Sequence, residues 1–426
     1  MSPVHPAPIS LAAPPRAVLT GLAVAVAGVL PSFLLGALAL QMGSELGFGV
    51  AGLGGATTAF FVISAVGSVP LGRLADRLGG RTAMRTAAVG SAACLLGVAL
   101  LARSYVSLLV VLVAGGVANA LAQPAVNAFL AGRVALDRQG LVFGIKQSAI
   151  PVAVLLSGLA LPIVALTVGW RFAYAGGALM ALGAAFAVSA AARVPEVAVA
   201  PERPSAGPSV ARLAPLGVAA ALGAFSGTAL GAFLVISAVA ADVSEGAAGV
   251  LLAAGSLVSL AVRVGAGWLA DRTGSEGLVP TVGLLAVGTL GFALLAVQAP
   301  WALVLGTLVA FGAGWGWPGL FNFAVVVRNP GSAAAATGIT QTGVYAGAGI
   351  GPLVFGQIVE RVSLPAAWFT AAAAAALAAL IVARSRRLER GAGQGASGAE
   401  APGAEGAPGS EGSPSGSRPF QVPSAP

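Results

Sequence analysis

One lysine and one arginine lie inside long apolar stretches, where a charge is costly. Lys146 is the only lysine of the chain, and Arg263 stands four residues before Gly267 in another apolar stretch. A charged side chain at the centre of a helix in hydrocarbon costs about 2.5–3.5 kcal/mol or more, so it often belongs to a functional site. Since no acidic residue lies near the middle of any apolar stretch, the two cations favour a small anion as ligand. The alternatives are snorkelling of both side chains to the lipid headgroups, and a pair between Arg263 and Asp271.

Uncharged side chains add further candidates for the same site. Asn119, Gln123 and Asn127 are spaced four residues apart, so they form one stripe on a helix. Such amides can bind substrate, or they can form hydrogen bonds between neighbouring helices. The matching region of the second half contains Trp315, Trp317 and Asn322. The two tryptophan side chains could form an aromatic wall of the site or serve as packing. Gln147 and Gln341 complete the set of candidates.

A short charged motif occurs twice, each time directly after an apolar stretch. Gly72-Arg73-Leu74-Ala75-Asp76-Arg77-Leu78-Gly79 returns 195 positions later as Gly267-Trp268-Leu269-Ala270-Asp271-Arg272-Thr273-Gly274. Two other landmarks repeat at an offset of 194, namely Gly144-Ile145-Lys146-Gln147-Ser148 with Gly338-Ile339-Thr340-Gln341-Thr342, and Pro124 with Pro318. The nearly constant offset indicates a chain built from two similar halves.

Composition predicts that the elements positioning these residues are membrane-spanning helices. Only 8% of residues are charged and 57% are apolar, whereas soluble domains contain about 25% charged residues. Runs of about 20 apolar residues can cross the hydrocarbon core as helices, and they lack the alternation that a barrel requires. The predicted spans are Ala17–Leu40, Gly49–Leu71, Thr82–Ala102, Val106–Leu130, Gly140–Leu166, Trp170–Ala192, Ala214–Ala240, Ala247–Ala266, Leu278–Val297, Trp301–Val327, Ala333–Val359 and Pro365–Val382.

One of these spans carries a stripe of glycines. Gly343, Gly347 and Gly351 fall four residues apart, on one face of the eleventh span. Glycines at this spacing allow two helix backbones to approach closely, so this face is predicted to pack on another helix.

The distribution of arginines predicts the orientation. With a cytoplasmic N-terminus, sixteen arginines from Arg16 to Arg390 lie on the cytoplasmic side, and only Arg103, Arg171 and Arg361 lie on the outer side. The positive-inside rule therefore places both termini in the cytoplasm. The net charge of +8 is explained by this topology and does not indicate nucleic-acid binding. Excess arginine over lysine, with abundant alanine, glycine and proline, suggests a GC-rich bacterial genome and hence the bacterial inner membrane.

The predicted fold class is an all-α integral membrane protein with twelve transmembrane helices in two pseudo-symmetric six-helix bundles. The predicted organisation is a cytoplasmic tail at 1–16, a first bundle at 17–192, a proline-rich linker at 193–213, a second bundle at 214–384 and a disordered tail at 385–426.

The motif Gly72-x-Leu74-Ala75-Asp76-Arg77-x-Gly79-x-Arg81 is similar to the signature of the major facilitator superfamily between its second and third helices. The resemblance implies two halves that rock about a central site, with Asp76 closing the cytoplasmic side against the start of the eleventh helix. The residues expected to form this conformational latch are Gly72, Asp76, Arg77, Gly79, Arg81, Arg133, Gly267, Asp271 and Arg272. One departure is Gly80, where the family often has a basic residue.

A second resemblance concerns the substrate. Arg263-x-x-x-Gly267-x-x-x-Asp271 resembles the eighth helix of monocarboxylate and oxalate/formate carriers, which implies that Arg263 pairs with a substrate carboxylate. Val264 departs from this pattern, because the monocarboxylate carriers usually have proline there. The acid in the first or fourth helix that exporters of cationic drugs commonly have is absent from these spans.

We therefore expect a secondary active transporter that moves a small solute, most simply an organic anion, by alternating access. Its partners are the lipid bilayer and that solute; a proton is one candidate for the coupling ion, and we expect a monomer. One alternative is a multidrug or metabolite efflux carrier of the same superfamily, and another is a transporter-like sensor or scaffold with little flux. The single histidine, His5, and single cysteine, Cys94, give no catalytic or metal-binding set, so we expect no enzyme, cofactor or metal.

Overall fold

The computed structural model describes residues 15–131, 146–191, 209–273, 277–329 and 332–398, and all regular structure in these ranges is helical. The chain divides into two compact units, Met1–Ser385 and Arg386–Pro426, and the contacts described below lie within the first. The first half of the sequence forms α1 Pro15–Ala37, α2 Ala39–Leu46, α3 Val50–Leu78, α4 Gly80–Leu101, α5 Tyr105–Ala131, α7 Ala149–Ala160, α8 Leu166–Val168 and α9 Trp170–Ala191. The second half forms α10 Val210–Ala240, α11 Glu245–Thr273, α12 Leu278–Leu295, α13 Pro300–Val309, α14 Pro318–Arg328, α15 Ala333–Arg361 and α16 Leu364–Gly398.

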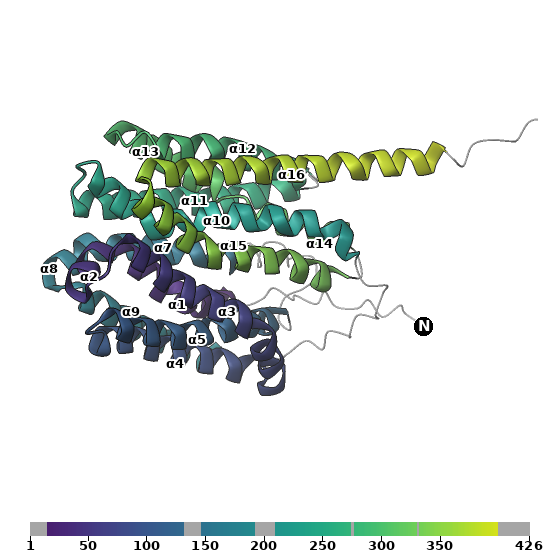
Figure 1. Ribbon diagram of the computed structural model, residues 1–426. Helices are drawn as coiled ribbons and strands as arrows, with labels where there is room; N and C mark the ends of the chain where they lie inside the picture. The colour runs from purple at the N-terminus through teal and green to yellow at the C-terminus, as the bar shows by residue number, and fades with distance from the viewer. Residues whose placement is uncertain (1–14, 132–145, 192–208, 274–276, 330–331, 399–426) are drawn as a thin grey trace, which may run out of the picture. The chain divides into compact units, whose positions relative to one another are not determined.

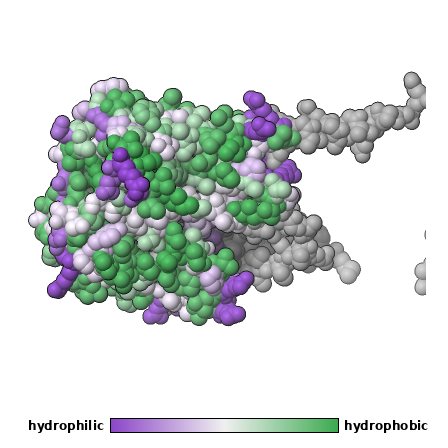
Figure 2. Space-filling model, in the orientation of Figure 1, coloured by the Kyte–Doolittle hydropathy of each residue, from purple (hydrophilic) through white to green (hydrophobic). Residues whose placement is uncertain are grey.

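The predicted number of spans is confirmed; the first residues of the fifth predicted span, 140–145, lie outside the described residues. Within the described ranges, twelve helical segments are long and apolar enough to cross a membrane, which makes the chain a multi-pass membrane protein. Apolar side chains cover the middle of the face seen in Figure 2, and hydrophilic ones gather toward its left and right ends. Many large apolar side chains are exposed, as expected for surfaces that face lipid.

Two helices extend into the segments predicted to be the linker and the C-terminal tail. α10 begins at Val210, four residues inside the predicted linker. Its N-cap is Ser209, whose side chain accepts a hydrogen bond from the main-chain N–H of Arg212, so a capping residue moves the start of the helix upstream. α16 continues to Gly398, inside the segment predicted to be disordered; the helix formers Leu388, Glu389 and Arg390 favour this continuation.

The fifth and tenth spans are broken by turns of π-helix. One turn, Leu161–Ala165, separates α7 from α8, and the other, Ala310–Gly314, precedes α14. π-helical turns inside membrane helices free main-chain groups and are frequent at functional sites. The repeated prolines occupy different local structures, because Pro124 lies inside α5 whereas Pro318 begins α14.

The predicted glycine face of the eleventh span packs on the seventh span. A Cβ atom added to Gly343 would lie 2.0 Å from the main-chain oxygen of Gly217, and one on Gly347 would lie 1.9 Å from that of Ala221. Since only hydrogen fits at these positions, α15 and α10 approach backbone to backbone. The prediction of close packing from the glycine spacing is thus confirmed.

Close backbone contacts join the two halves of the bundle near one end. We call the end where α1 begins the termini end, and the end where α1 gives way to α2 the far end (Figure 1). Near the far end three glycines of the first half contact backbone of the second half. A Cβ on Gly36 would lie 2.4 Å from the main-chain oxygen of Gly231, one on Gly54 2.3 Å from that of Pro352, and one on Gly158 2.7 Å from that of Gly249.

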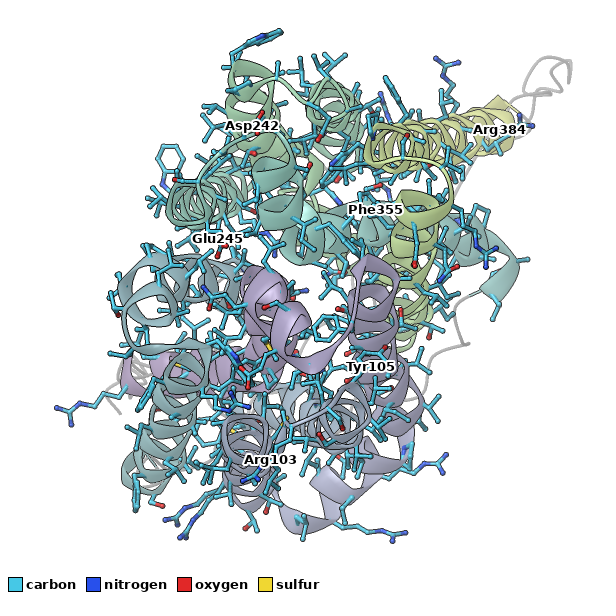
Figure 3. All side chains as sticks on the ribbon, turned by 60° about the vertical axis from the view of Figure 1, so that its left-hand side comes forward. Arg103, Tyr105, Asp242, Glu245, Phe355 and Arg384 are labelled. Carbon is cyan, nitrogen blue, oxygen red and sulfur yellow. The ribbon has the colours of Figure 1, made fainter. Side chains whose placement is uncertain are left out.

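A polar contact also joins the halves at the far end. The side-chain amide Nε2 of Gln41, on α2, donates to Oε2 of Glu245, the first residue of α11, at 3.3 Å. Figure 3 shows Glu245 where the violet and blue helices of the first half meet the green helices of the second half. The far end is therefore closed by both backbone packing and a hydrogen bond.

Candidate functional site

Arg263 is buried in α11 and ties together three parts of the bundle. Its side chain is only 6% exposed. Nε and Nη2 donate to the main-chain oxygen of Trp315 at 3.1 and 2.6 Å, and Nη1 donates to that of Gln147 at 2.7 Å. A guanidinium has five N–H donors, so three are used by these two carbonyls. Arg263, which the sequence predicts to hold a substrate carboxylate, thus binds main-chain carbonyls of both halves. We call these three hydrogen bonds the Arg263 brace.

The break in the tenth span explains why the carbonyl of Trp315 accepts these bonds. Trp315 lies between the π-helical turn and α14, and its N–H donates to the main-chain oxygen of Ala310 at 2.9 Å. Carbonyls at the end of a helical segment have no intrahelical donor and need another partner in a dry interior. Arg263 supplies that donor and, being charged, forms stronger hydrogen bonds than a neutral group.

Four aromatic side chains form a layer that crosses from one half to the other. The ring of Phe33 on α1 lies 6.3 Å from that of Phe61 and 5.9 Å from that of Trp315, both edge to face. Phe311 continues the set at 5.7 Å from Trp315. All four are buried. We call these residues the aromatic layer; it fills the space between the halves at the level of the helix break.

Lys146 lies close to the Arg263 brace but takes no part in it. Its neighbour in the chain, Gln147, gives its main-chain oxygen to Arg263. The lysine side chain is only 9% exposed, and among the described residues no hydrogen-bond or ion-pair partner reaches its ammonium group. A buried charge without a partner is strongly disfavoured, so this group would gain most from an anionic ligand.

Of the amide stripe of the fourth span, one side chain bonds to a neighbouring helix and the other two have no described partner. Asn119 is 2% exposed and donates through Nδ2 to Oγ of Ser64 on α3, at 3.0 Å. This bond links two helices, which is the structural alternative that the sequence left open. Gln123 is half-buried and Asn127 is exposed, and neither has a hydrogen-bond partner among the described side chains. Gln341 on α15 is likewise half-buried and unpartnered within the described ranges.

The first copy of the predicted latch lies at the termini end, where α3 meets α4. Gly79 has a φ of +76° and caps both helices, so the reversal needs glycine. A Cβ on Gly72 would stand 3.7 Å from Pro124, an ordinary contact. Asp76 is exposed and has no partner among the described residues, and Arg77 is exposed beside it. Arg81 donates from Nη2 to the main-chain oxygen of Ser189 at 3.2 Å, within the first half.

The second copy of the latch is less fully defined. Gly267 is exposed on α11, and no atom lies within 4 Å of the position that its Cβ would take. Arg133 lies outside the described residues, as do the side chains of Asp271 and Arg272. The structure therefore brings Gln147, Arg263 and Trp315 together through the brace, with Lys146 next to Gln147 in the chain, and it shows Asp76 without a described partner.

Sequence reasoning missed the roles of four residues. Phe33 and Phe61 belong to the aromatic layer, yet a phenylalanine in an apolar span carries no signal that separates it from ordinary packing. Gln41 and Glu245 pair at the far end across 204 positions of sequence. Their position near the ends of spans was visible, but their pairing was not.

Twelve spanning helices, with a broken helix and a buried arginine bonded to it, are typical of a multi-pass membrane transporter. The profile of the Major Facilitator Superfamily matches residues 20–352 and 216–421, in two overlapping segments. The chain belongs to this superfamily of secondary transporters.

Solved structures show the same fold. The chain is similar to a bacterial homologue of the human lysosomal transporter Spinster, in an inward-facing and occupied conformation, with a TM-score of 0.64 and 15% identity. The similarity covers 87% of this chain and 96% of that one. A search of curated protein sequences gives no match.

Proposed function

We propose that the protein carries a small anion, most simply an organic carboxylate, and that Lys146 binds it. The observation that carries this proposal is a buried lysine, 9% exposed, whose ammonium group has no partner among the described residues. Arg263 adds a second positive charge nearby, since its hydrogen bonds to carbonyls leave its charge uncompensated. A positive potential in a low-dielectric interior favours an anion over a cation or a neutral solute.

The arrangement of the halves supports transport by alternating access. Glycine contacts and the Gln41–Glu245 bond close the far end, and the aromatic layer lies between that closure and the depth of Arg263. With both termini in the cytoplasm of a bacterial cell, this arrangement corresponds to a carrier that faces inward. The lack of a described partner for Asp76 fits an open latch at the termini end.

The decisive experiment is a ligand screen on purified protein, read as the change in melting temperature. The panel contains lactate, oxalate, phosphate and sulfate, with tetraphenylphosphonium as the cationic comparison. We expect one of the anions to stabilise the protein, Lys146→Gln to abolish that stabilisation and Lys146→Arg to retain part of it. Arg85→Gln is the matched control, because Arg85 is exposed at the termini end. A stabilising anion whose effect survives Lys146→Gln would defeat the proposed site.

Export of drugs or metabolites is the second candidate function. The aromatic layer favours it, because edge-to-face rings suit an apolar cargo. Stabilisation by tetraphenylphosphonium with no response to any anion would select this function over anion transport. Transport assays in proteoliposomes loaded with the selected compound would then establish flux, which a sensor or scaffold would lack.

A further inference from the structure

A pocket at the far end gathers two of the few positive charges found there. The pocket has a volume of about 480 Å³ and is lined by Glu45, Ala99, Leu100, Arg103 and Arg171. This volume lies within the usual range for small-ligand sites. The sequence assigns only three arginines to this side of the membrane, and two of them share this one pocket. Their convergence is independent of the central site and needs its own explanation.

The charge of Arg171 is already compensated. Its Nη1 pairs with Oε1 of Glu45 at 2.5 Å, and its Nη2 donates to the main-chain oxygen of Ala102 at 2.9 Å. Trp170 donates from Nε1 to the other oxygen of the carboxylate at 2.7 Å. The hydrogen bonds from Arg171 and Trp170 hold the pKa of Glu45 below its usual range, so this carboxylate stays ionised near neutral pH.

Arg103, in contrast, is uncompensated. Its main-chain N–H donates to Oγ of Ser107 at 3.0 Å, which fixes the loop between α4 and α5. No hydrogen-bond or ion-pair partner of its side chain is found among the described residues. One carboxylate against two guanidinium groups leaves the pocket with a net charge of about +1. The pocket therefore complements a group with a single negative charge.

The surroundings of the pocket face lipid. Leu100 and Leu101 at the end of α4 are 61% and 63% exposed, and Phe172, next to Arg171 in the chain, is 61% exposed. Figure 3 shows Arg103 at this end of the bundle. Exposed apolar side chains beside arginines, at the ends of membrane helices, correspond to the boundary between acyl chains and headgroups.

We propose that this pocket binds the headgroup phosphate of an anionic phospholipid, with Arg103 as its principal ligand. A phosphodiester carries one negative charge and accepts hydrogen bonds from a guanidinium in a fork. The acyl chains then lie against Leu100 and Phe172. Snorkelling alone would put Arg103 at the membrane surface, but it would not explain why a second arginine and a neutralising carboxylate share the pocket.

Native mass spectrometry of the full-length protein in neutral detergent tests this proposal. The probes are dioctanoyl phosphatidylglycerol, the zwitterionic dioctanoyl phosphatidylcholine and phosphatidylethanolamine, and inorganic phosphate as competitor. We expect phosphatidylglycerol to bind the unaltered protein most tightly, and Arg103→Gln to weaken that binding by about tenfold or more, the value of one charged hydrogen bond. Arg361→Gln is the matched control, since Arg361 is the third arginine assigned to this side and does not line the pocket.

A second variant changes the affinity in the opposite direction. Glu45→Gln removes the carboxylate and frees Arg171, so it should tighten phosphatidylglycerol binding, an outcome that misfolding would not produce. Equal losses of phosphatidylglycerol affinity in Arg103→Gln and Arg361→Gln would overturn the proposal, because the lipid would then be attracted only by the general surface charge. Displacement of the lipid by inorganic phosphate would also overturn it, because the ligand would then be a free anion. So would tighter binding of either zwitterionic lipid.

Discussion

Arg263 holds the main-chain carbonyl of Trp315 with two of its nitrogens, Nη2 at 2.6 Å and Nε at 3.1 Å. The carbonyl belongs to the break in the tenth span, and the same guanidinium reaches Gln147 of the other half. An arginine at this place therefore links the shape of the broken helix to the relative position of the halves. A rocking motion of the halves must either carry this link along or break the bond to Gln147.

Replacing Arg263 should destabilise the protein through the carbonyls that it now satisfies. Arg263→Met leaves the oxygens of Trp315 and Gln147 without these donors in a dry interior, at about 1–3 kcal/mol for each. Arg263→Lys should lose less stability, because one ammonium group can still reach one carbonyl. Urea unfolding in detergent measures the free energy of unfolding of both variants. If Arg263→Met kept its stability but lost anion binding, Arg263 would be a substrate ligand and not a group that stabilises the fold.

A side chain at Gly54 should force the far end apart. A Cβ there would lie 2.3 Å from the main-chain oxygen of Pro352, so a rotamer change cannot relieve the clash. Gly54→Val is expected to disfavour the closed far end by about 1–3 kcal/mol. Spin labels at Gln41→Cys and Glu245→Cys in a Cys94→Ser background should then report a longer distance. Gly183→Val is the control, since no atom lies within 4 Å of its Cβ position; an equal change in both variants would refute a specific closure.

A cross-link between Gln41 and Glu245 should arrest transport. The two side chains are 3.3 Å apart across the halves, so a short bifunctional thiol reagent can join cysteines at both positions. We expect flux in proteoliposomes to fall to background and to recover when the link is reduced. Either cysteine alone, treated with the same reagent, should transport normally. Full activity of the cross-linked protein would mean that the far end does not open during transport.

The Glu45–Arg171 pair should contribute to stability above the usual pKa range of a glutamate and lose its contribution in acid. The pKa of Glu45 is lowered in the folded protein, so unfolded chains take up a proton first as the pH falls. The difference in melting temperature between the unaltered protein and Glu45→Gln should be constant near neutral pH and shrink below about pH 4. For a pair this exposed it corresponds to at most about 1 kcal/mol. Glu360→Gln, at an exposed carboxylate without a described partner, is the matched control for the substitution itself.

The spans, the duplication and the glycine face of the eleventh span were predictable from sequence because each rests on a local pattern. Hydropathy over about 20 residues decides whether a segment partitions into lipid, and glycine every fourth residue decides whether a helix face is flat. Gly343 and Gly347 pack on α10 as this pattern predicts. Sequence and structure differ at the start of α10 and at the end of α16, where a capping residue and helix formers extend the helices beyond the apolar residues.

The roles of the buried polar residues were decided only by tertiary structure. Lys146 and Arg263 look alike in sequence, as single cations in apolar stretches. Arg263 is satisfied by carbonyls 52 and 116 positions away, whereas Lys146 has no described partner. Asn119 likewise bonds Ser64, 55 positions away. The sequence by itself determined which segments enter the membrane, because partitioning depends on each segment alone; the fold decided which charges are satisfied, because that depends on groups brought together from distant parts of the chain.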